Sequence, residues 1–124
     1  MDYHALRNKE IRKYAPKHIG IYFLGDLEKG KFTVRYVGRS DWSIQNRLLN
    51  HPYKMMFGFF SYQKTATIKD AFLLETENYY LYKNTLINKI HPDLPKNLIL
   101  EHPSDTLGRI FKKRILKGVK YGRN

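Results

Sequence analysis

The chain has 124 residues, of which 42% are hydrophobic and 27% charged, and 23 Lys and Arg stand against 11 Asp and Glu, a formal net charge of +12. This length predicts one domain. No apolar run approaches the roughly 18 residues that a membrane span needs. The absence of cysteine excludes disulfides and Cys-ligated zinc. A pI near 9.9 favours a polyanionic partner, because phosphate contacts supply much of the affinity of proteins for nucleic acid. Residues 1–17 lack an apolar signal-peptide core, so we expect a cytoplasmic protein.

The first half of the chain predicts a helix and two strands. Residues 1–17 form a basic N-terminal segment, with a short helix expected over about 6–14. Strands rich in β-branched and aromatic residues are predicted at about 18–24 and 32–37. The polar segment 25–31 between them has glycine near both ends and predicts a turn, so the two strands should form an antiparallel hairpin.

Two further helices and a third strand are predicted after the hairpin. The polar stretch that ends at Ser43 is typical of a helix cap and precedes a short helix at 44–50. Residues 57–62 predict a strand. Thr67 and Asp70 resemble a capping box that opens a helix running to about residue 82.

Together these elements predict a small α+β domain in the order ββαβα. The core is expected over residues 18–92, and 93–124 should add a loop and a basic amphipathic helix, over 107–119, to the same domain. No repeat, low-complexity tract or linker divides the chain.

Glu75 is the residue that most strongly suggests chemistry. At 100° per residue it falls in the middle of the apolar stripe formed by Ile68, Ala71, Phe72, Tyr79 and Tyr82, whereas Glu77 falls on the opposite face. A carboxylate among apolar side chains must be paired, protonated or bound to a metal. One interpretation is a structural ion pair with Arg47 or another base, and the other is Mg²⁺ held by one carboxylate, waters and phosphate oxygens.

Four other residues could act with Glu75. Arg47 and His51 lie one helical turn apart; an arginine fork suits a transferring phosphate, and a histidine can move protons or orient a neighbour. Tyr22 and Tyr36 stand on the two predicted hairpin strands and could be core residues or site residues. They share a face of the sheet only in one register, and a tyrosine base needs positive charge nearby.

Five short strings in order resemble the GIY-YIG nuclease superfamily, over roughly residues 19–92. They are Gly20-Ile21-Tyr22, Tyr36-Val37-Gly38-Arg39-Ser40 with valine where the family name has isoleucine, Arg47-Leu48 with His51, Ala71-Phe72-Leu73-Leu74-Glu75, and Leu86-Ile87-Asn88-Lys89-Ile90-His91-Pro92. The resemblance implies a three-stranded antiparallel sheet flanked by helices, and hydrolysis of phosphodiesters with one divalent metal.

The resemblance also implies a catalytic set, which in this chain is Tyr22, Tyr36, Arg39, Arg47, His51, Glu75 and Asn88. In that set Glu75 would ligate Mg²⁺ or Mn²⁺, and Tyr22 is the leading candidate to activate the attacking water. Tyr36 and His51 would position or assist that water, and Arg47 would stabilise charge in the transition state. The 3′ oxygen would leave, giving 5′-phosphate ends.

Arg39 would lie near the phosphate and Asn88 would close the site. Contacts to nucleic acid are also expected from Trp42, an aromatic residue on a loop beside the predicted site, and from the basic C-terminal segment, specifically Lys112, Lys113, Arg114 and Lys117.

The sequence therefore predicts a small stand-alone metal-dependent endonuclease whose partner is nucleic acid, expected to be DNA. Sequence specificity would need a homodimer, another partner or tolerance of many sites. Two alternatives stay open: a non-catalytic nucleic-acid-binding module that retains the nuclease fold, and a basic interaction protein. Metal dependence separates the first hypothesis from both alternatives, and salt-sensitive DNA binding separates the alternatives from each other.

Overall fold

The computed structural model describes residues 1–87 and residue 95, and the predicted helix at 107–119 lies outside the described residues. Seven elements follow one another: β1 (His4–Ala5), α1 (Asn8–Tyr14), β2 (Gly20–Glu28), β3 (Lys31–Ser40), α2 (Ile44–Leu49), β4 (Phe59–Lys64) and α3 (Ile68–Leu81). The α+β prediction is confirmed. In the described part of the chain no helix is long and apolar enough to cross a membrane.

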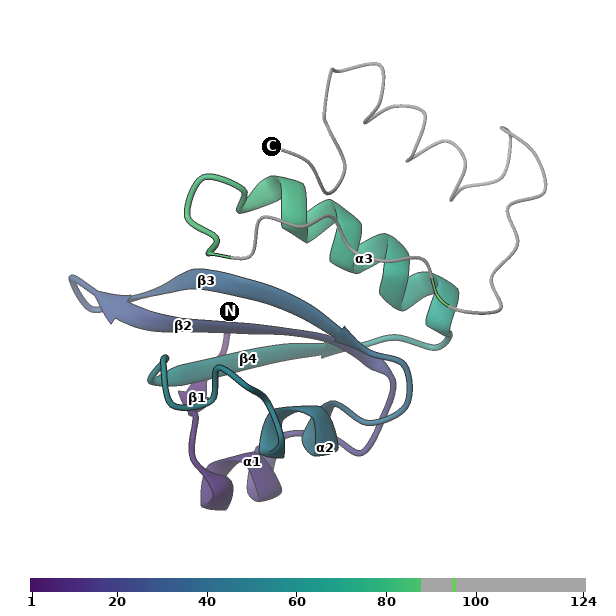
Figure 1. The fold of residues 1–124 in the computed structure, drawn as a ribbon, viewed down its shortest axis with the longest axis horizontal. Coiled ribbons are helices and arrows are strands. Elements are labelled where there is room, and N and C mark those ends of the chain that lie inside the picture. Colours follow the sequence, from purple (N-terminus) through teal and green to yellow (C-terminus); the bar gives the residue numbers. More distant parts are fainter. Residues whose placement is uncertain (88–94, 96–124) are drawn as a thin grey trace.

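One antiparallel sheet organises the described residues, with strand order β1-β4-β2-β3. Figure 1 shows α3 lying across one face of this sheet and α1 with α2 on the other. The four strands of this part of the chain exceed the three expected, because β1 was not predicted. It is only two residues long and is defined by its pairing with β4, so it carries no periodic pattern of its own.

The hairpin between β2 and β3 is tighter than predicted. The segment 25–31 is not a loop: β2 continues to Glu28 and β3 begins at Lys31, which leaves only Lys29 and Gly30 between them. Both residues have positive φ, 54° and 78°, as a two-residue hairpin turn with the twist of the strands requires. Polar residues remain in the strand because the end of β2 is exposed.

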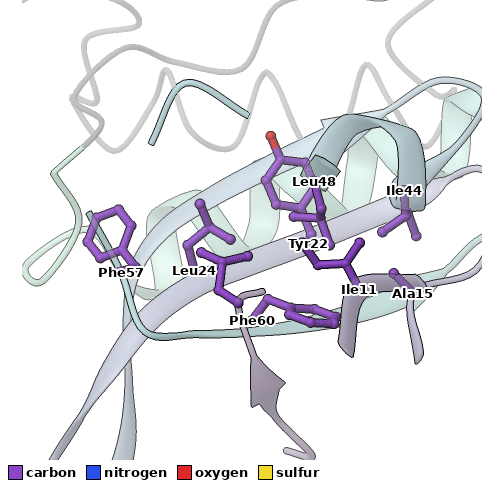
Figure 2. Packing of buried hydrophobic residues seen from close by; sticks show 9 residues of the cluster. Ile11, Ala15, Tyr22, Leu24, Ile44, Leu48, Phe57 and Phe60 are labelled. Carbon is purple, nitrogen blue, oxygen red and sulfur yellow. The ribbon is translucent and has the colours of Figure 1, made fainter. Parts of the chain in front are cut away.

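Alternate side chains of β2 pack into two hydrophobic cores, one on each face of the sheet. Tyr22 and Leu24 point to the α1/α2 face, where Figure 2 shows them packed with Ile44 and Leu48 of α2 and with other buried side chains (Ile11, Ala15, Phe57 and Phe60). Ile21 and Phe23 point the other way and pack with residues of β3 and α3 (Val34, Val37, Ala71 and Tyr79). β2 is therefore a central strand buried on both faces.

The two helix caps are confirmed at the predicted residues. The Ser43 side chain accepts a hydrogen bond from the backbone N–H of Asn46 at the start of α2, and the Thr67 side chain accepts one from the N–H of Asp70 at the start of α3. Each cap satisfies a backbone donor that the helix itself leaves unpaired. The caps set where both helices begin, and so the phase of the residues that follow.

The helical phase of α3 is also confirmed. Ala71, Phe72, Glu75 and Tyr79 are buried and Glu77 is exposed, so α3 turns Glu75 inward. Ile68 is the exception: it was predicted in the buried stripe but is 38% exposed, because it is the first residue of the helix and stands at the end of the covered face.

Candidate active site

Tyr22 and Tyr36 share one face of the sheet. Tyr22 pairs with Gly38 and Tyr36 pairs with Leu24, so the two tyrosines are two register positions apart and both face α2. Their rings stack with centroids 6.2 Å apart and an angle of 14° between the planes. The structure thus settles the register that the sequence left open.

Gly38 makes room for the Tyr22 ring. A Cβ atom built on Gly38 would lie 2.3 Å from both Cζ and Oη of Tyr22, far inside ordinary contact distance. The ring crosses the neighbouring strand at the one position that has no side chain. The glycine of the Tyr36-Val37-Gly38 string is therefore a packing requirement of the tyrosine in the other string.

Two N–H groups converge on the hydroxyl oxygen of Tyr22. Arg47 donates from Nε at 3.2 Å, and His51 Nε2 lies 2.9 Å away. The backbone N–H of Tyr53 donates to His51 Nδ1 at 3.0 Å, so in the neutral ring the proton is on Nε2 and is donated to Tyr22. With both donors pointing at the oxygen, the hydroxyl proton of Tyr22 is directed away from them.

The electrostatics keep this network in one protonation state near neutral pH. Burial, assisted by the charge of Arg47, lowers the pKa of His51 to about 4, so the ring is neutral at pH 7. Burial raises the pKa of Tyr22 well above its usual 10 and also raises the pKa of Tyr36, while Arg47 opposes both shifts. Burial acts to lower the pKa of Arg47, but the neighbouring Tyr22 and Tyr36 outweigh it and the net shift is upward.

Arg47 also faces solvent. The residue as a whole is exposed although its Nε is bonded to Tyr22, so the positive charge beside the two tyrosines is accessible to a phosphate. The Tyr22 hydroxyl lies at the edge of the apolar cluster in Figure 2, pointing away from the packed side chains. A buried phenol hydroxyl, a fixed imidazole and an accessible guanidinium thus meet at one place.

Glu75 enters the site from the opposite face of the sheet, at the edge strand β3. Its Oε1 accepts a hydrogen bond from Arg39 Nη1 at 2.8 Å, and both side chains are 11% exposed. Arg39 also donates from Nε to Asp41 Oδ1 at 2.7 Å, and its guanidinium lies 5.4 Å from the centre of the Phe72 ring. The ion-pair partner that the sequence left open is therefore Arg39.

The two halves of the site lie within electrostatic reach of each other. The charge of Glu75 contributes to raising the pKa of both Tyr22 and Tyr36, although these tyrosines point to the other face. Glu75 is a buried carboxylate with hard oxygen ligands, which suits a divalent ion that takes its other ligands from water and phosphate. Among the described residues no group of three or more His, Cys, Asp or Glu is placed to hold a metal, so a site there would take at most two such side chains from this part of the chain.

Two residues of the site were not predicted. Tyr53 fixes the His51 ring through its backbone N–H, and its own ring packs against the Tyr36 ring with centroids 5.5 Å apart. A sequence pattern does not indicate which backbone N–H will donate to a side chain. Asp41 was interpreted only as part of a helix cap, yet it is a partner of Arg39. Its place directly beside the Tyr36–Ser40 string was the one available hint.

The remaining predicted residues divide into two groups. Trp42 is 69% exposed on the loop between β3 and α2, so its ring is accessible, and its contact with nucleic acid stays a prediction. The others lie outside the described residues, namely Asn88, Lys112, Lys113, Arg114 and Lys117.

Comparison with known proteins gives a likeness in structure alone. No family model matches the sequence, and the search of curated proteins gives no match. Two solved structures are similar to this chain, and both are point mutants of the GIY-YIG N-terminal endonuclease domain of UvrC from Thermotoga maritima bound to its catalytic divalent cation. They are 25% and 24% identical in sequence, the alignment covers 59% of this chain and 89% of each domain, and the TM-score is 0.45 in both cases.

Proposed function

We propose that this protein is a metal-dependent endonuclease that hydrolyses phosphodiester bonds of nucleic acid, with DNA as the expected substrate. The observation that carries the proposal is the convergence of Arg47 and His51 on the Tyr22 hydroxyl. The charge of the buried Glu75 also acts on this hydroxyl. The net charge of +12 supports a polyanionic substrate. The five strings that resemble GIY-YIG nucleases support the reaction class.

Tyr22 is the proposed base. Its oxygen receives two N–H donors, which stabilise the phenolate, and its proton is directed away from them toward the site. Because burial raises its pKa, only a small fraction is phenolate at pH 7, and the rate should grow with that fraction. Tyr36, stacked on Tyr22, positions the attacking water beside it.

His51 is the proposed positioning residue for this base. With a pKa of about 4 it carries no charge at pH 7, and both of its ring nitrogens are engaged. It therefore holds the phenol oxygen in place rather than exchanging protons with the substrate. Arg47, charged and accessible, binds the phosphate and stabilises the charge that develops on it.

Glu75 would hold the divalent cation, Mg²⁺ or Mn²⁺, which when bound supplies positive charge to the phosphate and to the leaving 3′ oxygen. Arg39 lies beside that carboxylate and is suited to contact the scissile phosphate or its neighbour. Trp42 extends the surface over which nucleic acid could stack. Cleavage by this route leaves 5′-phosphate ends.

One observation favours a second candidate, a nucleic-acid-binding module that retains the fold without activity. The ion pair with Arg39 satisfies the buried Glu75 carboxylate in the absence of any metal, so a structural role accounts for its burial equally well. A cleavage assay separates the two candidates.

The test uses supercoiled plasmid, linear duplex, single-stranded DNA and RNA, each with Mg²⁺, Mn²⁺ or EDTA. We expect cutting that depends on the metal and is lost in Glu75→Gln, whereas the control Glu77→Gln, on the exposed face of the same helix, cuts as the unsubstituted protein does. Cutting by Glu75→Gln at the normal rate would refute the metal site. Salt-sensitive binding with no cutting on any substrate would favour the binding module.

A further inference from the structure

Asp41 and Glu75 are joined through a single guanidinium. Arg39 donates from Nε to Asp41 Oδ1 at 2.7 Å and from Nη1 to Glu75 Oε1 at 2.8 Å, so the two carboxylates use different nitrogens and do not compete for one hydrogen. These are short, charge-assisted bonds. Arg39 can therefore weaken one bond while the other still holds it in place.

The two carboxylates differ in their surroundings. Glu75 and Arg39 are each 11% exposed, and the Phe72 ring lies against the guanidinium, whereas Asp41 is 39% exposed at the edge of the site. The backbone on either side of Asp41 is held in a turn, because the Ser40 hydroxyl oxygen accepts hydrogen bonds from the backbone N–H groups of Trp42 and Ser43. The backbone that carries the outer carboxylate is thus fixed without depending on Arg39.

A divalent cation bound to the Glu75 carboxylate would draw on the same negative charge to which Arg39 now donates at Oε1, and so would weaken that bond. Loss of this bond in a poorly hydrated place would cost free energy unless a second anion paired with the Arg39 guanidinium. The positive charge of Arg39 would also repel the incoming cation. Asp41 supplies this second anion, because it already bonds Arg39, and its negative charge reduces the repulsion between Arg39 and the cation.

We propose that Asp41 is a positioning residue for the metal site: it retains Arg39 when Glu75 engages a divalent cation, and it thereby sets the affinity for that cation. The inference rests on the proposed function only in taking Glu75 as the metal ligand. Asp41 itself need not touch the metal.

The experiment is a Mn²⁺ titration of the full chain followed by electron paramagnetic resonance of the free ion, with no nucleic acid and no turnover. We expect Asp41→Asn to weaken Mn²⁺ binding by about tenfold, because Arg39 without its second anion keeps its bond to Glu75 and its charge opposes the ion. Glu77→Gln removes the same charge from the exposed face of α3 and should leave the affinity unchanged. Equal affinity in Asp41→Asn and the unsubstituted protein would overturn the inference.

A second background tests whether Asp41 acts through Arg39. Arg39→Gln removes the competing cation, so Asp41→Asn should change Mn²⁺ affinity by less than about twofold when added to it. The same tenfold loss in both backgrounds would make Asp41 a direct ligand or a simple charge, which contradicts the positioning role. The thermal unfolding midpoint of each variant controls for folding, and a partly exposed pair contributes little to it.

The failure of this inference can be told apart from the failure of the proposed function. If Glu75→Gln binds Mn²⁺ as well as the unsubstituted protein, or if neither binds it, the metal site itself is wrong and the role of Asp41 falls with it. If Glu75→Gln loses binding and Asp41→Asn does not, the metal site stands and only the role of Asp41 is refuted.

Discussion

Replacing Gly38 with alanine should displace Tyr22 from the position in which it receives its two hydrogen bonds. The new methyl carbon would lie 2.3 Å from Cζ and Oη of Tyr22, so the ring must retreat by about 1 Å to reach ordinary contact at 3.4 Å. The bonds to His51 and Arg47, now 2.9 and 3.2 Å long, would then stretch to about 4 Å, beyond hydrogen-bonding range.

The size of the effect follows from these distances. Overpacking of this kind costs about 1–3 kcal/mol, and loss of the two hydrogen bonds adds about 1 kcal/mol or more, so we expect a free energy of unfolding lower by about 2–4 kcal/mol. A displacement of about 1 Å at a reacting group should also slow cleavage by about 100-fold.

Urea denaturation and a single-turnover cleavage assay measure the two effects on Gly38→Ala. Gly58→Ala is the matched control, because its added Cβ would meet only Asp26 Oδ1, at 3.4 Å, and the residue lies outside the site. Normal stability and normal cleavage in Gly38→Ala would show that Tyr22 is not held against this glycine, and the proposed arrangement of the base would be wrong.

Three further predictions concern pH and packing. Histidine in an unfolded chain has a pKa near 6.5, whereas burial lowers the pKa of folded His51 to about 4, so the free energy of unfolding should fall by up to about 3 kcal/mol as the pH drops through this window. In urea denaturation, His51→Gln should lack this pH-dependent loss. Parallel curves of stability against pH for the two proteins would contradict the prediction. If the Tyr22 phenolate is the base, the single-turnover rate should rise about tenfold per pH unit from 7 to 9, because burial keeps its pKa above the usual 10, and a plateau near pH 7 would exclude that role. Leu48→Ala, at a fully buried site on α2, should lower the free energy of unfolding by about 2–5 kcal/mol, well beyond the effect of Leu49→Ala on the partly buried side of the same helix.

Features that depend on residues close together in the chain could be predicted from the sequence. The caps at Ser43 and Thr67 act on N–H groups three residues away, and the burial of Glu75 against the exposure of Glu77 follows from the fixed 100° step of a helix. The α+β class follows in the same way, because every helix and strand except β1 has a residue pattern of its own in the sequence.

Features that depend on which distant residues meet could not be predicted in this way. The register that pairs Tyr22 with Gly38 places both tyrosines on one face, and a slip of one residue would have separated them. The partner of Glu75 is 36 residues away, and the choice of Arg39 over Arg47 depends on which face of β3 meets α3. β1 exists only through its pairing with β4.

The sequence by itself therefore determined the kinds of residue available, the elements that carry them and the inward turn of Glu75. Only the tertiary structure decided how they act together: that His51 is oriented by the backbone of Tyr53, that Tyr22 receives two N–H donors, and that Arg39 links two carboxylates. The physical reason is that caps and helical phase arise from interactions within one turn of the chain. Hydrogen-bond partners and charge pairs arise from the packing of strands and helices that are distant in sequence.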